Sequence, residues 1–365
     1  MRSRSLWVGL FALGVTGMTA CTDETMTEPS RTAEPHPPAP DLAVASNTWV
    51  VKATMPQYRT GVATATVTNA AGRPIVYAIG GVNPIWKNPQ QTVTAYNAAT
   101  NTWTVRRPLP LRLARTNGAG VINGKIYISG GCRDHQCFYP TNALYMYDPA
   151  KDVWTQKRSI PPDSTSNGPY GENRYADGNG VTGVINGKLY VVSGCFENDS
   201  EHGYFESCSP LFFRYNPATD RWLQLPSPFA VPEYGPSIGG VIDGKFYVMT
   251  SNAANFAAYD PATNRWTPLN ALGGGTRYEA ASAVVGGKLY VFGGLRYDNF
   301  STDTLIVDTL ATTVRYDAAT RTWAQRADLP GPRAGSAADR LYLNGKARIE
   351  VLGGSGTGNN LQYTP

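Results

Sequence analysis

The chain has 365 residues, of which 16% are charged, and its formal net charge is +5. That length is enough for one large domain and a leader segment, and the 38 glycines and 27 prolines are typical of a fold with many turns. The slight basic excess contains no long run of Lys or Arg, so the composition argues against a nucleic-acid-binding surface.

The first 20 residues have the features of a secretory signal. Arg2 and Arg4 precede an apolar stretch at residues 6–15 that is too short to span a bilayer. Residues 18–21, Met-Thr-Ala-Cys, resemble the cleavage box of bacterial lipoproteins, with Met where Leu is usual. They predict a protein exported to the bacterial periplasm or cell surface and held at a membrane by a lipid on Cys21; secretion without the lipid is the alternative.

Residues 21–44 are rich in Thr, Pro and Ala, which predicts an unstructured tether between the lipid and a domain at residues 45–365. Removal of residues 1–20 takes away two arginines and leaves 30 basic and 27 acidic residues, a net charge of +3.

An eight-residue unit recurs along this domain. Residues Tyr259 to Trp266 (YDPATNRW) have near-copies, each with the Trp seven positions after the Tyr. The copies lie at residues 96–103, 147–154, 215–222 and 316–323. A unit that returns about every 50 residues indicates a repeat architecture. Asp or Asn followed by Pro favours a tight turn, and flanking aromatics favour half-buried strands, so the unit predicts strand, turn and strand.

A second hairpin precedes each copy. Two-residue turn signals lie between apolar runs, at Asn123-Gly124, Asn186-Gly187 and Asp243-Gly244. An aromatic-containing strand follows, at residues 126–131, 189–194, 246–251 and 289–294. Each repeat is thus predicted to hold four strands: A, a tight turn, B, a variable loop, C, a Pro turn, and D, which carries the Trp.

Four of the B strands end in a pair of glycines: Gly80-Gly81, Gly130-Gly131, Gly293-Gly294 and Gly353-Gly354. Together with the Tyr and Trp positions, these pairs resemble the Kelch repeat. The resemblance covers roughly residues 45 to 365 and implies an all-β fold, a β-propeller with one four-stranded blade per repeat. The third repeat keeps only Gly194, followed by Cys195, and the fourth has Ser251-Asn252 instead.

The number of blades is predicted from the two ends of the domain. Residues 361–365 (LQYTP) match the first half of the eight-residue unit, and residues 45–49 (ASNTW) match its second half. We therefore expect six blades, the last of which takes strands A to C from the C-terminal part and strand D from the N-terminal part. Such closure removes open sheet edges.

Four cysteines remain beyond Cys21, and each pair follows a B strand. In an exported protein this predicts disulfides Cys132–Cys137 and Cys195–Cys208. Pairing between blades is disfavoured, because equivalent points should lie beyond the reach of a disulfide, about 7 Å between Cα atoms. Free buried thiols are the alternative, and a zinc site lacks a second closely spaced pair of ligands.

The long insertions fall on one face of the expected ring, where the B–C loops and the D–A links between blades lie. They span about residues 82–91, 132–142, 195–210 and 295–308, together with the link 157–179. Long loops on a rigid scaffold usually carry function, so we expect this face to bind a ligand; neutral drift of surface loops is the alternative.

Arginine and tyrosine recur in the D–A links. The predicted ligand-binding residues there are Arg59, Arg115, Arg174, Tyr175, Tyr234, Arg277, Tyr278 and Arg333, with Tyr58, Arg112, Glu233 and Glu279 beside them. Planar guanidinium groups suit carboxylates, and tyrosine adds a flat face with a polar tip. A ring of them would suit an acidic peptide or an acidic sugar. The alternative is structural: the arginines pair with neighbouring carbonyls or acids.

Trp86 lies outside the strand D position, in the first B–C loop, where it is predicted to stack on a sugar or anchor a partner. Equally, it would fill a small core of its own loop. The repeated Tyr and Trp residues are expected to pack between blades.

The three histidines give little support for a metal site. His36 lies in the tether, and His135 and His202 lie inside the two cysteine loops, with acids nearby in sequence: Asp134, Glu197, Asp199 and Glu201. Solvated polar loops are favoured over a metal or acid–base site. We expect no cofactor.

The favoured hypothesis is a monomeric module that binds a protein or glycan and is not an enzyme. An alternative is a sugar mutarotase of the sialic-acid mutarotase kind, which resembles this chain in fold, length and export only. One of Arg59, Arg115, Arg277 or Arg333 would then hold the carboxylate, and Glu233 or Glu279 would move the proton. A structural subunit of an envelope assembly is the second alternative. The copper-radical chemistry of galactose oxidase is not expected, because the candidate histidines lie in the cysteine loops.

Overall fold

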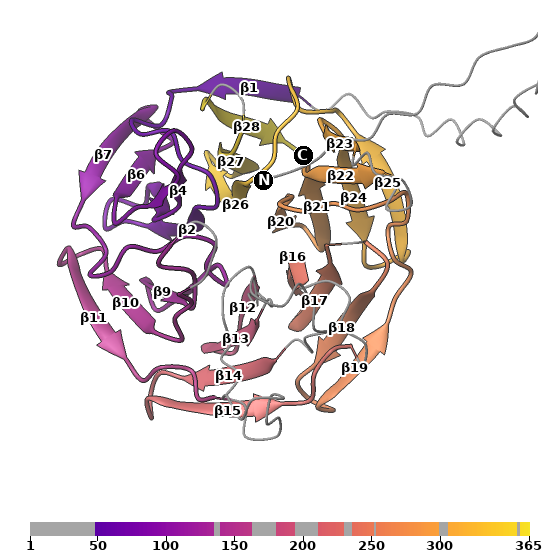
Figure 1. Cartoon of the computed structure of the whole chain (residues 1–365), viewed down its shortest axis with the longest axis horizontal. Coiled ribbons are helices and arrows are strands. Elements are labelled where there is room, and N and C mark those ends of the chain that lie inside the picture. Colours follow the sequence, from indigo (N-terminus) through magenta and orange to yellow (C-terminus); the bar gives the residue numbers. More distant parts are fainter. Residues whose placement is uncertain are drawn as a thin grey trace, which may run out of the picture. The chain divides into compact units, whose positions relative to one another are not determined.

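A computed structural model describes residues 48–134, 139–162, 180–193, 211–229, 236–251, 253–298, 306–355 and 358–365. The chain divides into two compact units, residues 1–41 and 42–365, and the described residues all belong to the second. In this described part the regular elements are strands, arranged as six four-stranded sheets around a ring (Figure 1). The predicted all-β, six-bladed propeller is confirmed. The predicted leader and tether lie outside the described residues, and their boundaries stay predictions.

Each blade runs from an inner strand A to an outer strand D, and each strand pairs antiparallel with its neighbour. Blade 1 holds β2 (Ala63–Thr68), β3 (Pro74–Ile79), β6 (Val93–Asn97) and β7 (Thr102–Arg106). Blade 2 holds β8 (Ala119–Ile122), β9 (Lys125–Ser129), β10 (Leu144–Asp148) and β11 (Val153–Lys157). Blade 3 holds β12 (Val181–Ile185), β13 (Lys188–Val192), β14 (Phe212–Asn216) and β15 (Arg221–Leu225).

Blade 4 holds β16 (Pro236–Ile242), β17 (Lys245–Thr250), β18 (Phe256–Asp260) and β19 (Arg265–Pro268). Blade 5 holds β20 (Ala281–Val285), β21 (Lys288–Phe292), β24 (Thr313–Asp317) and β25 (Thr322–Arg326). Blade 6 holds β26 (Ser336–Leu343), β27 (Lys346–Gly353), β28 (Asn360–Thr364) and β1 (Thr48–Lys52). Two B–C loops form small hairpins: β4 (Val82–Asn83) with β5 (Asn88–Pro89), and β22 (Leu295–Asp298) with β23 (Ile306–Thr309).

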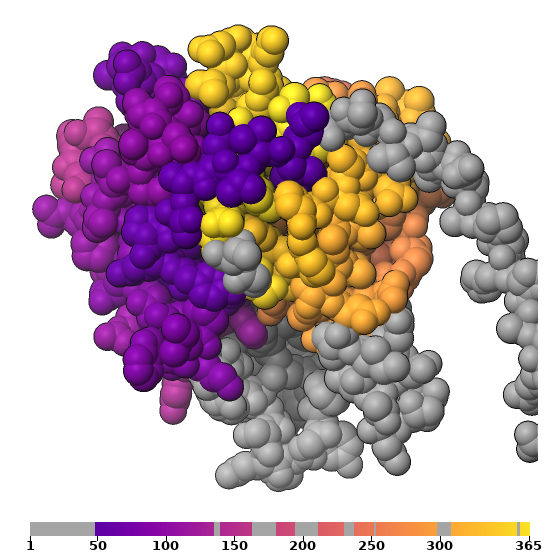
Figure 2. Space-filling view, turned by 90° about the horizontal axis from the view of Figure 1, so that it is seen from above, coloured from indigo at the N-terminus to yellow at the C-terminus, as the bar shows by residue number. Residues whose placement is uncertain are grey.

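The last blade closes as the two ends of the domain predicted. Strand β1 pairs antiparallel with β28, in a register that sets Trp49 opposite Tyr363. The same Tyr–Trp opposition recurs in the other blades, for example Tyr96 with Trp103. In the space-filling view, the indigo N-terminal strand lies against yellow C-terminal residues (Figure 2). Pairing between strands from the two ends therefore completes the sixth sheet.

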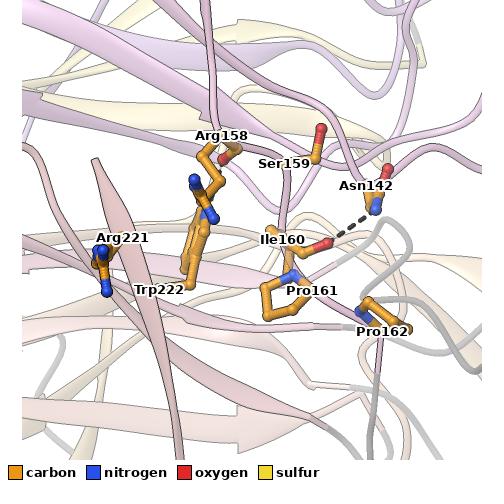
Figure 3. Close-up of a pocket in the computed structure, with 8 residues that line it drawn as sticks. All are labelled: Asn142, Arg158, Ser159, Ile160, Pro161, Pro162, Arg221 and Trp222. Carbon is orange, nitrogen blue, oxygen red and sulfur yellow. Dashed lines mark hydrogen bonds between the residues drawn. The ribbon is translucent and has the colours of Figure 1, made fainter. Parts of the chain in front are cut away.

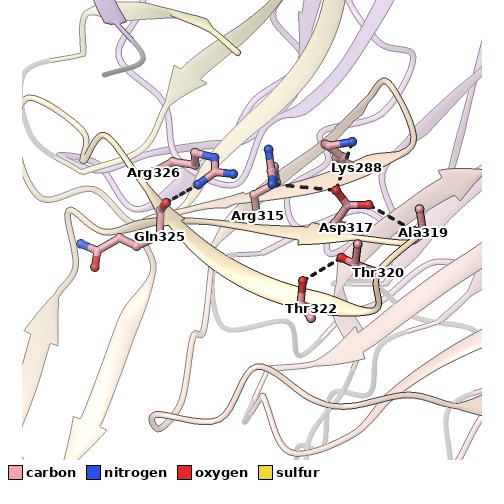
Figure 4. Close-up of polar contacts among 8 residues, drawn as sticks. All are labelled: Lys288, Arg315, Asp317, Ala319, Thr320, Thr322, Gln325 and Arg326. Atoms are coloured by element: carbon pink, nitrogen blue, oxygen red, sulfur yellow. Dashed lines mark hydrogen bonds and ion pairs between the residues drawn. The ribbon is translucent and has the colours of Figure 1, made fainter. Parts of the chain in front are cut away.

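The C–D turn explains why the eight-residue unit is repeated. In blade 5 the Asp317 carboxylate accepts a hydrogen bond from the Ala319 amide at 3.1 Å and pairs with Lys288 at 3.2 Å, while the Thr320 and Thr322 hydroxyls bond at 2.8 Å (Figure 4). The Arg321 backbone between them has a φ of 57°, which Asn or Asp tolerates best and which those residues supply in four other turns. The turn thus fixes the register of each outer hairpin.

Each strand D tryptophan ties its blade to the preceding one. The indole nitrogen of Trp154, for instance, donates to the Arg107 carbonyl of blade 1 at 3.0 Å. The other five bonds are Trp49 to Ala327, Trp103 to Ala53, Trp222 to Arg158, Trp266 to Pro226 and Trp323 to Asn270, at 2.7–3.0 Å. These half-buried side chains supply packing and a directional bond together, as expected for tryptophan.

Tyrosines fill five of the six interfaces between blades. A tyrosine on strand B packs against the buried strand C tyrosine of the next blade, with ring centroids 5.7–6.2 Å apart. The pairs are Tyr77–Tyr147, Tyr127–Tyr215, Tyr190–Tyr259, Tyr247–Tyr316 and Tyr290–Tyr363. Such aromatic pairs each add roughly 0.5–1.5 kcal/mol to the burial of apolar surface.

The interface between blades 6 and 1, called the seam below, is different. Its strand B position holds Glu350, which is fully buried and accepts a hydrogen bond from Gln362 at 2.6 Å. Burial raises the pKa of Glu350 to about 7, although the hydrogen bond from Gln362, the nearby Asn360 amide and the charge of Lys52 oppose the shift. The seam is therefore the interface at which a titratable group replaces an aromatic ring.

Candidate functional site

Three of the predicted arginines lie inside the ring wall. Arg59, Arg277 and Arg333 hold the same position in blades 1, 5 and 6, and each is less than a tenth exposed. Arg59 donates to the carbonyls of Gly80 at 2.6 Å and Thr92 at 2.8 Å, and burial lowers its pKa to about 10. It therefore stays charged at neutral pH while its donors hold main-chain oxygens.

The other two make equivalent bonds. Arg277 donates to the Gly293 carbonyl at 3.2 Å and to the Thr312 hydroxyl at 2.8 Å, and Arg333 donates to the Gly353 carbonyl at 3.2 Å. Each guanidinium thus holds the first glycine of its own blade's Gly pair. This is the structural alternative stated for these arginines, and because it engages their donors inside the wall, we take Arg59, Arg277 and Arg333 out of the candidate binding site.

The main chain at the same position joins neighbouring blades. Where the next link is described, the second glycine of a pair donates to a carbonyl of that link: Gly354 to Arg59 at 3.0 Å, and Gly294 to Arg333 at 2.8 Å. A Cβ on Gly293 would lie 2.1 Å from the Arg333 oxygen, so only glycine fits there. In blade 2 this position holds Leu113, which accepts from Gly81 at 2.9 Å. Arg115 therefore lies two residues beyond the wall position.

Arg115 instead meets Glu279. Its Nη2 lies 3.5 Å from Glu279 Oε1, and the two side chains are 33% and 38% exposed. Arg115 belongs to blade 2 and Glu279 to blade 5, which are opposite each other in the order of six blades. The structure thus brings together one predicted arginine and one predicted acid across the central opening, with both side chains reaching solvent.

A tyrosine pair from blade 5 lies beside this ion pair. The rings of Tyr278 and Tyr297 meet edge to face, with centroids 4.9 Å apart. Burial and the charge of Glu279 raise the pKa of Tyr297, while the charge of Arg115 lowers it. The Tyr297 hydroxyl is therefore protonated at neutral pH and lies within the field of both charges. On the same hairpin, Arg296 pairs with Asp308 at 2.7 Å.

Trp86 lies at the exposed tip of the hairpin β4–β5. Trp86 is 75% exposed and its neighbour Ile85 is 76% exposed, so neither fills a core of the loop. The Asn83 side chain caps the turn by accepting from the amides of Ile85 at 2.9 Å and Trp86 at 3.2 Å. The tip thus presents two large apolar side chains on a fixed turn.

The base of this hairpin is held between two links. Thr60 and Val82 exchange main-chain hydrogen bonds at 2.8 and 3.0 Å, and Leu113 donates to the Gln90 carbonyl at 3.2 Å. The hairpin of blade 5 starts in the same way, because Tyr278 and Leu295 exchange bonds at 2.7 and 3.0 Å. The Trp86 tip and the Arg115–Glu279 pair therefore share the face of the B–C loops and D–A links.

Three exposed or half-exposed residues of this face were missed from the sequence: Ile85, Tyr139 and Tyr297. Tyr139, in the B–C loop of blade 2, is 62% exposed, with the Arg133 guanidinium 5.8 Å from its ring centroid. All three lie in insertions outside the repeat pattern. The insertions pointed to the face but not to single residues, because exposure of a loop side chain depends on the turn beneath it.

A hollow between blades 2 and 3 has a volume of about 480 Å³ and is lined in part by the outer strand β15 (Figure 3). Arg158, Ile160 and Trp222 are among its lining residues. The Asn142 amide donates to the Ile160 carbonyl at 2.8 Å, and Trp222 donates to the Arg158 carbonyl. These groups hold the blades together, so we assign the hollow no ligand.

Several predicted residues lie outside the described part of the chain: Cys21, His135, Cys137, Arg174, Tyr175, Cys195, His202, Cys208, Glu233 and Tyr234. Their roles stay predictions, as do both disulfides. Cys132 is described and fully buried, with its main chain bonded to Ala114. Tyr58 is half-buried, and Arg112 is exposed.

The described residues contain neither a metal-binding cluster nor a membrane-spanning helix. No cluster of three or more His, Cys, Asp or Glu residues is placed there to hold a metal ion. Within the same residues, no helix has the length and apolar character needed to cross a membrane.

Comparison with known proteins points to one family. The model of the Kelch motif matches residues 115–160 and 276–330. The chain is 29% identical over 306 residues to Kelch-like protein terF of Aspergillus terreus, covering 80% of this chain and 60% of that protein. It is 29% identical over 185 residues to human Kelch repeat and BTB domain-containing protein 12, covering 47% of this chain and 27% of that protein. The chain thus spans three fifths or less of these relatives' length.

Among solved structures, that of YjhT superposes with a TM-score of 0.63. The match covers 87% of this chain and 96% of YjhT at 15% sequence identity, so it supports the fold alone.

Proposed function

The chain is a Kelch-repeat β-propeller, and on that premise we propose that it is a module that holds a protein partner on the face of its B–C loops and D–A links. Propellers of one fold host many activities, so the argument rests on this face and not on the fold. The observation that carries it is the tip of hairpin β4–β5, where Ile85 and Trp86 are about three quarters exposed.

A protein partner explains this tip better than chance exposure does. Single exposed apolar residues are common, but two large ones side by side on a capped turn are not a requirement of the blade. Tryptophan is enriched among the residues that dominate binding energy at protein interfaces. The tip is also held in place at its base, so little conformational freedom is lost when it is buried.

The rest of the face supplies polar contacts. Tyr139 lies in the next blade's B–C loop, and the Arg115–Glu279 pair lies at the central opening. An apolar anchor with charged groups nearby is the usual composition of a protein interface. A glycan is the other ligand that Trp86 would suit, and the experiment below separates the two.

We do not pursue the mutarotase alternative. Arg59, Arg277 and Arg333 donate to main-chain carbonyls, so they are not available to hold a substrate carboxylate. Arg115 and Glu279, the candidates that remain among the described residues, form an ion pair at the central opening.

The test compares two equally exposed positions. A photo-crosslinking amino acid replaces Trp86 in one chain and Val105 in another; Val105 is 74% exposed but lies on the outer strand β7. We expect one defined protein to crosslink at position 86 and not at 105. Trp86→Ala should then weaken binding of that purified protein at least about tenfold, and Val105→Ala should leave it unchanged. Equal crosslinking at both positions, or saturable binding to a glycan array alone, would refute a protein-binding function.

We also propose, on sequence grounds, that the protein is exported and anchored by a lipid on Cys21, with residues 21–44 as the tether. The charged start, short apolar run and Met-Thr-Ala-Cys box support this. Metabolic labelling with a fatty-acid analogue should mark the chain, and Cys21→Ala should abolish the label and release the protein from membranes. A labelled Cys21→Ala variant would contradict it.

The disulfides Cys132–Cys137 and Cys195–Cys208 are part of the same proposal, because they require an oxidising compartment. A peptide map without reductant should recover each pair as one linked peptide. Recovery of free thiols at these positions would contradict both the pairing and the compartment.

A further inference from the structure

Four D–A links contribute one residue each to a continuous hydrogen-bonded arc, here called the axial arc: Glu279, Gly335, Gly61 and Arg115. The Gly335 amide donates to the Glu279 carbonyl at 2.9 Å, Gly61 to Gly335 at 2.7 Å, and Arg115 to Gly61 at 3.2 Å. The arc therefore runs through blades 5, 6, 1 and 2 at the end of the ring where the links enter the A strands.

All four residues have a positive φ: 54° at Glu279, 66° at Gly335, 60° at Gly61 and 50° at Arg115. Glycine adopts this conformation freely, whereas other residues are strained by about 1 kcal/mol or more. The two middle positions are glycine, and the two ends are not. The backbone of the arc thus requires a left-handed residue but does not require Arg or Glu.

The glycines also make room for the charged ends. A Cβ on Gly335 would lie 3.1 Å from Glu279 Oε2, and a Cβ on Gly61 would lie 3.4 Å from Arg115 Cγ. The two long side chains therefore lie over the glycines and meet at 3.5 Å across the opening. The charged side chains thus lie directly against the two glycines of the arc.

The stability of the fold does not account for this arrangement. An ion pair with one third of each side chain exposed is worth about 0–1 kcal/mol, which the two strained backbones offset. Strain of this kind, held in place by the surrounding structure, is found mainly at functional sites. Among the described residues, the Tyr297 phenol adds a neutral hydroxyl within the influence of both charges.

We propose that the axial arc is a docking site for a protein segment that presents an acidic and a basic side chain side by side. This deepens the proposed function and rests on it. The partner's carboxylate forms an ion pair with the Arg115 guanidinium, and the partner's ammonium or guanidinium group forms one with the Glu279 carboxylate. One ion pair within the chain is thus replaced by two ion pairs between proteins. A segment with a single charge would leave the other member of the pair without its opposite charge, which disfavours it.

The arrangement also has polarity, because Arg115 comes from blade 2 and Glu279 from blade 5. A segment that binds with its acid toward blade 2 cannot bind the other way round with the rest of its contacts unchanged. The site should therefore distinguish an acid–base order from a base–acid order.

The experiment selects random 12-residue peptides, displayed on phage, on the full chain and on four variants. The first is the exchange Arg115→Glu with Glu279→Arg, which keeps the ion pair but reverses its polarity. The second and third are Arg115→Gly and Glu279→Gly, and the fourth is Trp86→Ala. We expect the natural chain to enrich peptides with neighbouring unlike charges in one order, and the exchanged chain to enrich the opposite order. Each glycine variant should bind the selected peptides about tenfold more weakly.

Melting temperature provides a second reading. Because glycine relieves the positive φ, Arg115→Gly and Glu279→Gly should change the melting temperature by no more than about 2 °C. A large drop would assign the pair a structural role and overturn the proposal. Enrichment of peptides with an acid alone, or an order that does not reverse in the exchanged chain, would also overturn it.

The outcomes separate this inference from the proposed function. Peptides whose binding depends on Trp86 but not on Arg115 or Glu279 would refute the docking site and leave the binding module standing. Enrichment no greater on the natural chain than on Trp86→Ala, with no crosslinked protein at position 86, would refute both.

Discussion

The seam between blades 6 and 1 differs in chemistry from the other five interfaces between blades, although all six occupy equivalent places in the ring. In the five, a strand B tyrosine lies on the next blade's strand C tyrosine, within clusters such as Tyr77, Tyr147 and Ile128. At the seam, Glu350 takes the place of that tyrosine and faces Tyr96, whose pKa is raised by its own burial and, to a smaller extent, by the charge of Glu350. The apolar cluster of the seam, which includes Val76, Tyr96 and Leu352, is also the smallest among the described residues.

This difference separates two ways of specifying an interface. Aromatic pairs supply free energy through buried area and tolerate small shifts. A buried carboxyl that accepts a hydrogen bond from Gln362 supplies less net stability, because its desolvation opposes this bond, but it penalises any arrangement that separates the two side chains. The seam lies beside β1, where Val50 and Val51 are both about half exposed, so apolar burial specifies the strand's register only weakly.

The largest effect is expected at an ordinary interface. Tyr147 is fully buried, its ring meets Tyr77 and Trp154, and its hydroxyl donates to Asp152. Tyr147→Ala should lower the free energy of unfolding by about 3–5 kcal/mol because it leaves a cavity. Denaturant unfolding measures this, with Val105→Ala as the exposed control, expected within about 0.5 kcal/mol. If Tyr147→Ala lost no more unfolding free energy than Val105→Ala, the tyrosine pairs would not be the source of stability at the five ordinary interfaces.

The next effect concerns pH and is confined to the seam. A carboxyl whose pKa is raised to about 7 in the fold holds its proton more tightly there than in the unfolded chain, so its contribution is complete below the unfolded value of 4.5 and is lost as the pH rises through 7. Asp339, opposite Glu350 on β26, has its pKa raised by burial as well and adds in the same direction. Stability should therefore fall between about pH 4.5 and 7.5 by roughly 2–3 kcal/mol.

Glu350→Gln tests the source of this fall. The amide keeps the shape of the side chain but does not titrate, so most of the pH dependence of the free energy of unfolding should disappear. At pH 8 the variant should be more stable than the natural chain. Unfolding titrations at half-unit pH intervals measure both. An unchanged slope in Glu350→Gln would show that the seam does not titrate as its burial implies.

A smaller effect is expected where the wall arginine meets the seam. Arg59 donates to Gly80 and Thr92 of its own blade, while its carbonyl accepts from Gly354 of blade 6. Arg59→Leu copies the residue of blade 2, Leu113, and removes the donor of the Gly80 carbonyl, while the Thr92 carbonyl keeps the Gly80 amide at 3.0 Å. It should cost about 1–2 kcal/mol, measured against the exposed Arg112→Leu. Equal stability of the two variants would mean that Leu substitutes fully at this position.

The smallest effect comes from Lys52, on β1. Its positive charge lowers the pKa of Glu350 against the larger effect of burial. Lys52→Met should therefore move the pH at which stability is lost upward, with a change in stability of a few tenths of a kcal/mol. The same pH series detects it. A downward movement would contradict the electrostatic account of the seam.

How much of this was predictable depends on how local the cause is. A repeated local sequence pattern predicts the blades and the Tyr and Trp positions without coordinates. The same pattern, divided between residues 45–49 and 361–365, predicts the closure of the ring. Glu350 was also predictable: Glu350-Val-Leu-Gly-Gly stands where Tyr127-Ile-Ser-Gly-Gly stands in blade 2, and the sixth B strand lacks the aromatic residue of the others.

The functional face was less accessible. Arg59 and Arg115 look alike in sequence, each a few residues before a strand A, yet one is buried and the other is one third exposed. In blade 2 the position equivalent to Arg59 is held by Leu113, and Arg115 lies two residues further along the chain. Only the main-chain hydrogen bonds between blades reveal this offset. The meeting of Arg115 with Glu279 depends on the ring as a whole, because the two residues are remote in sequence and belong to opposite blades.

The bond from Trp49 to the Ala327 carbonyl has a consequence for how the molecule is made. The ribosome produces β1 first, yet β1 has no sheet to join until β28, the final strand, has been synthesised. Every other blade can assemble as it emerges, whereas the sixth can close only after β28 has been made. During that interval an edge bearing two valines stays available to whatever chaperone or transport machinery handles the nascent protein.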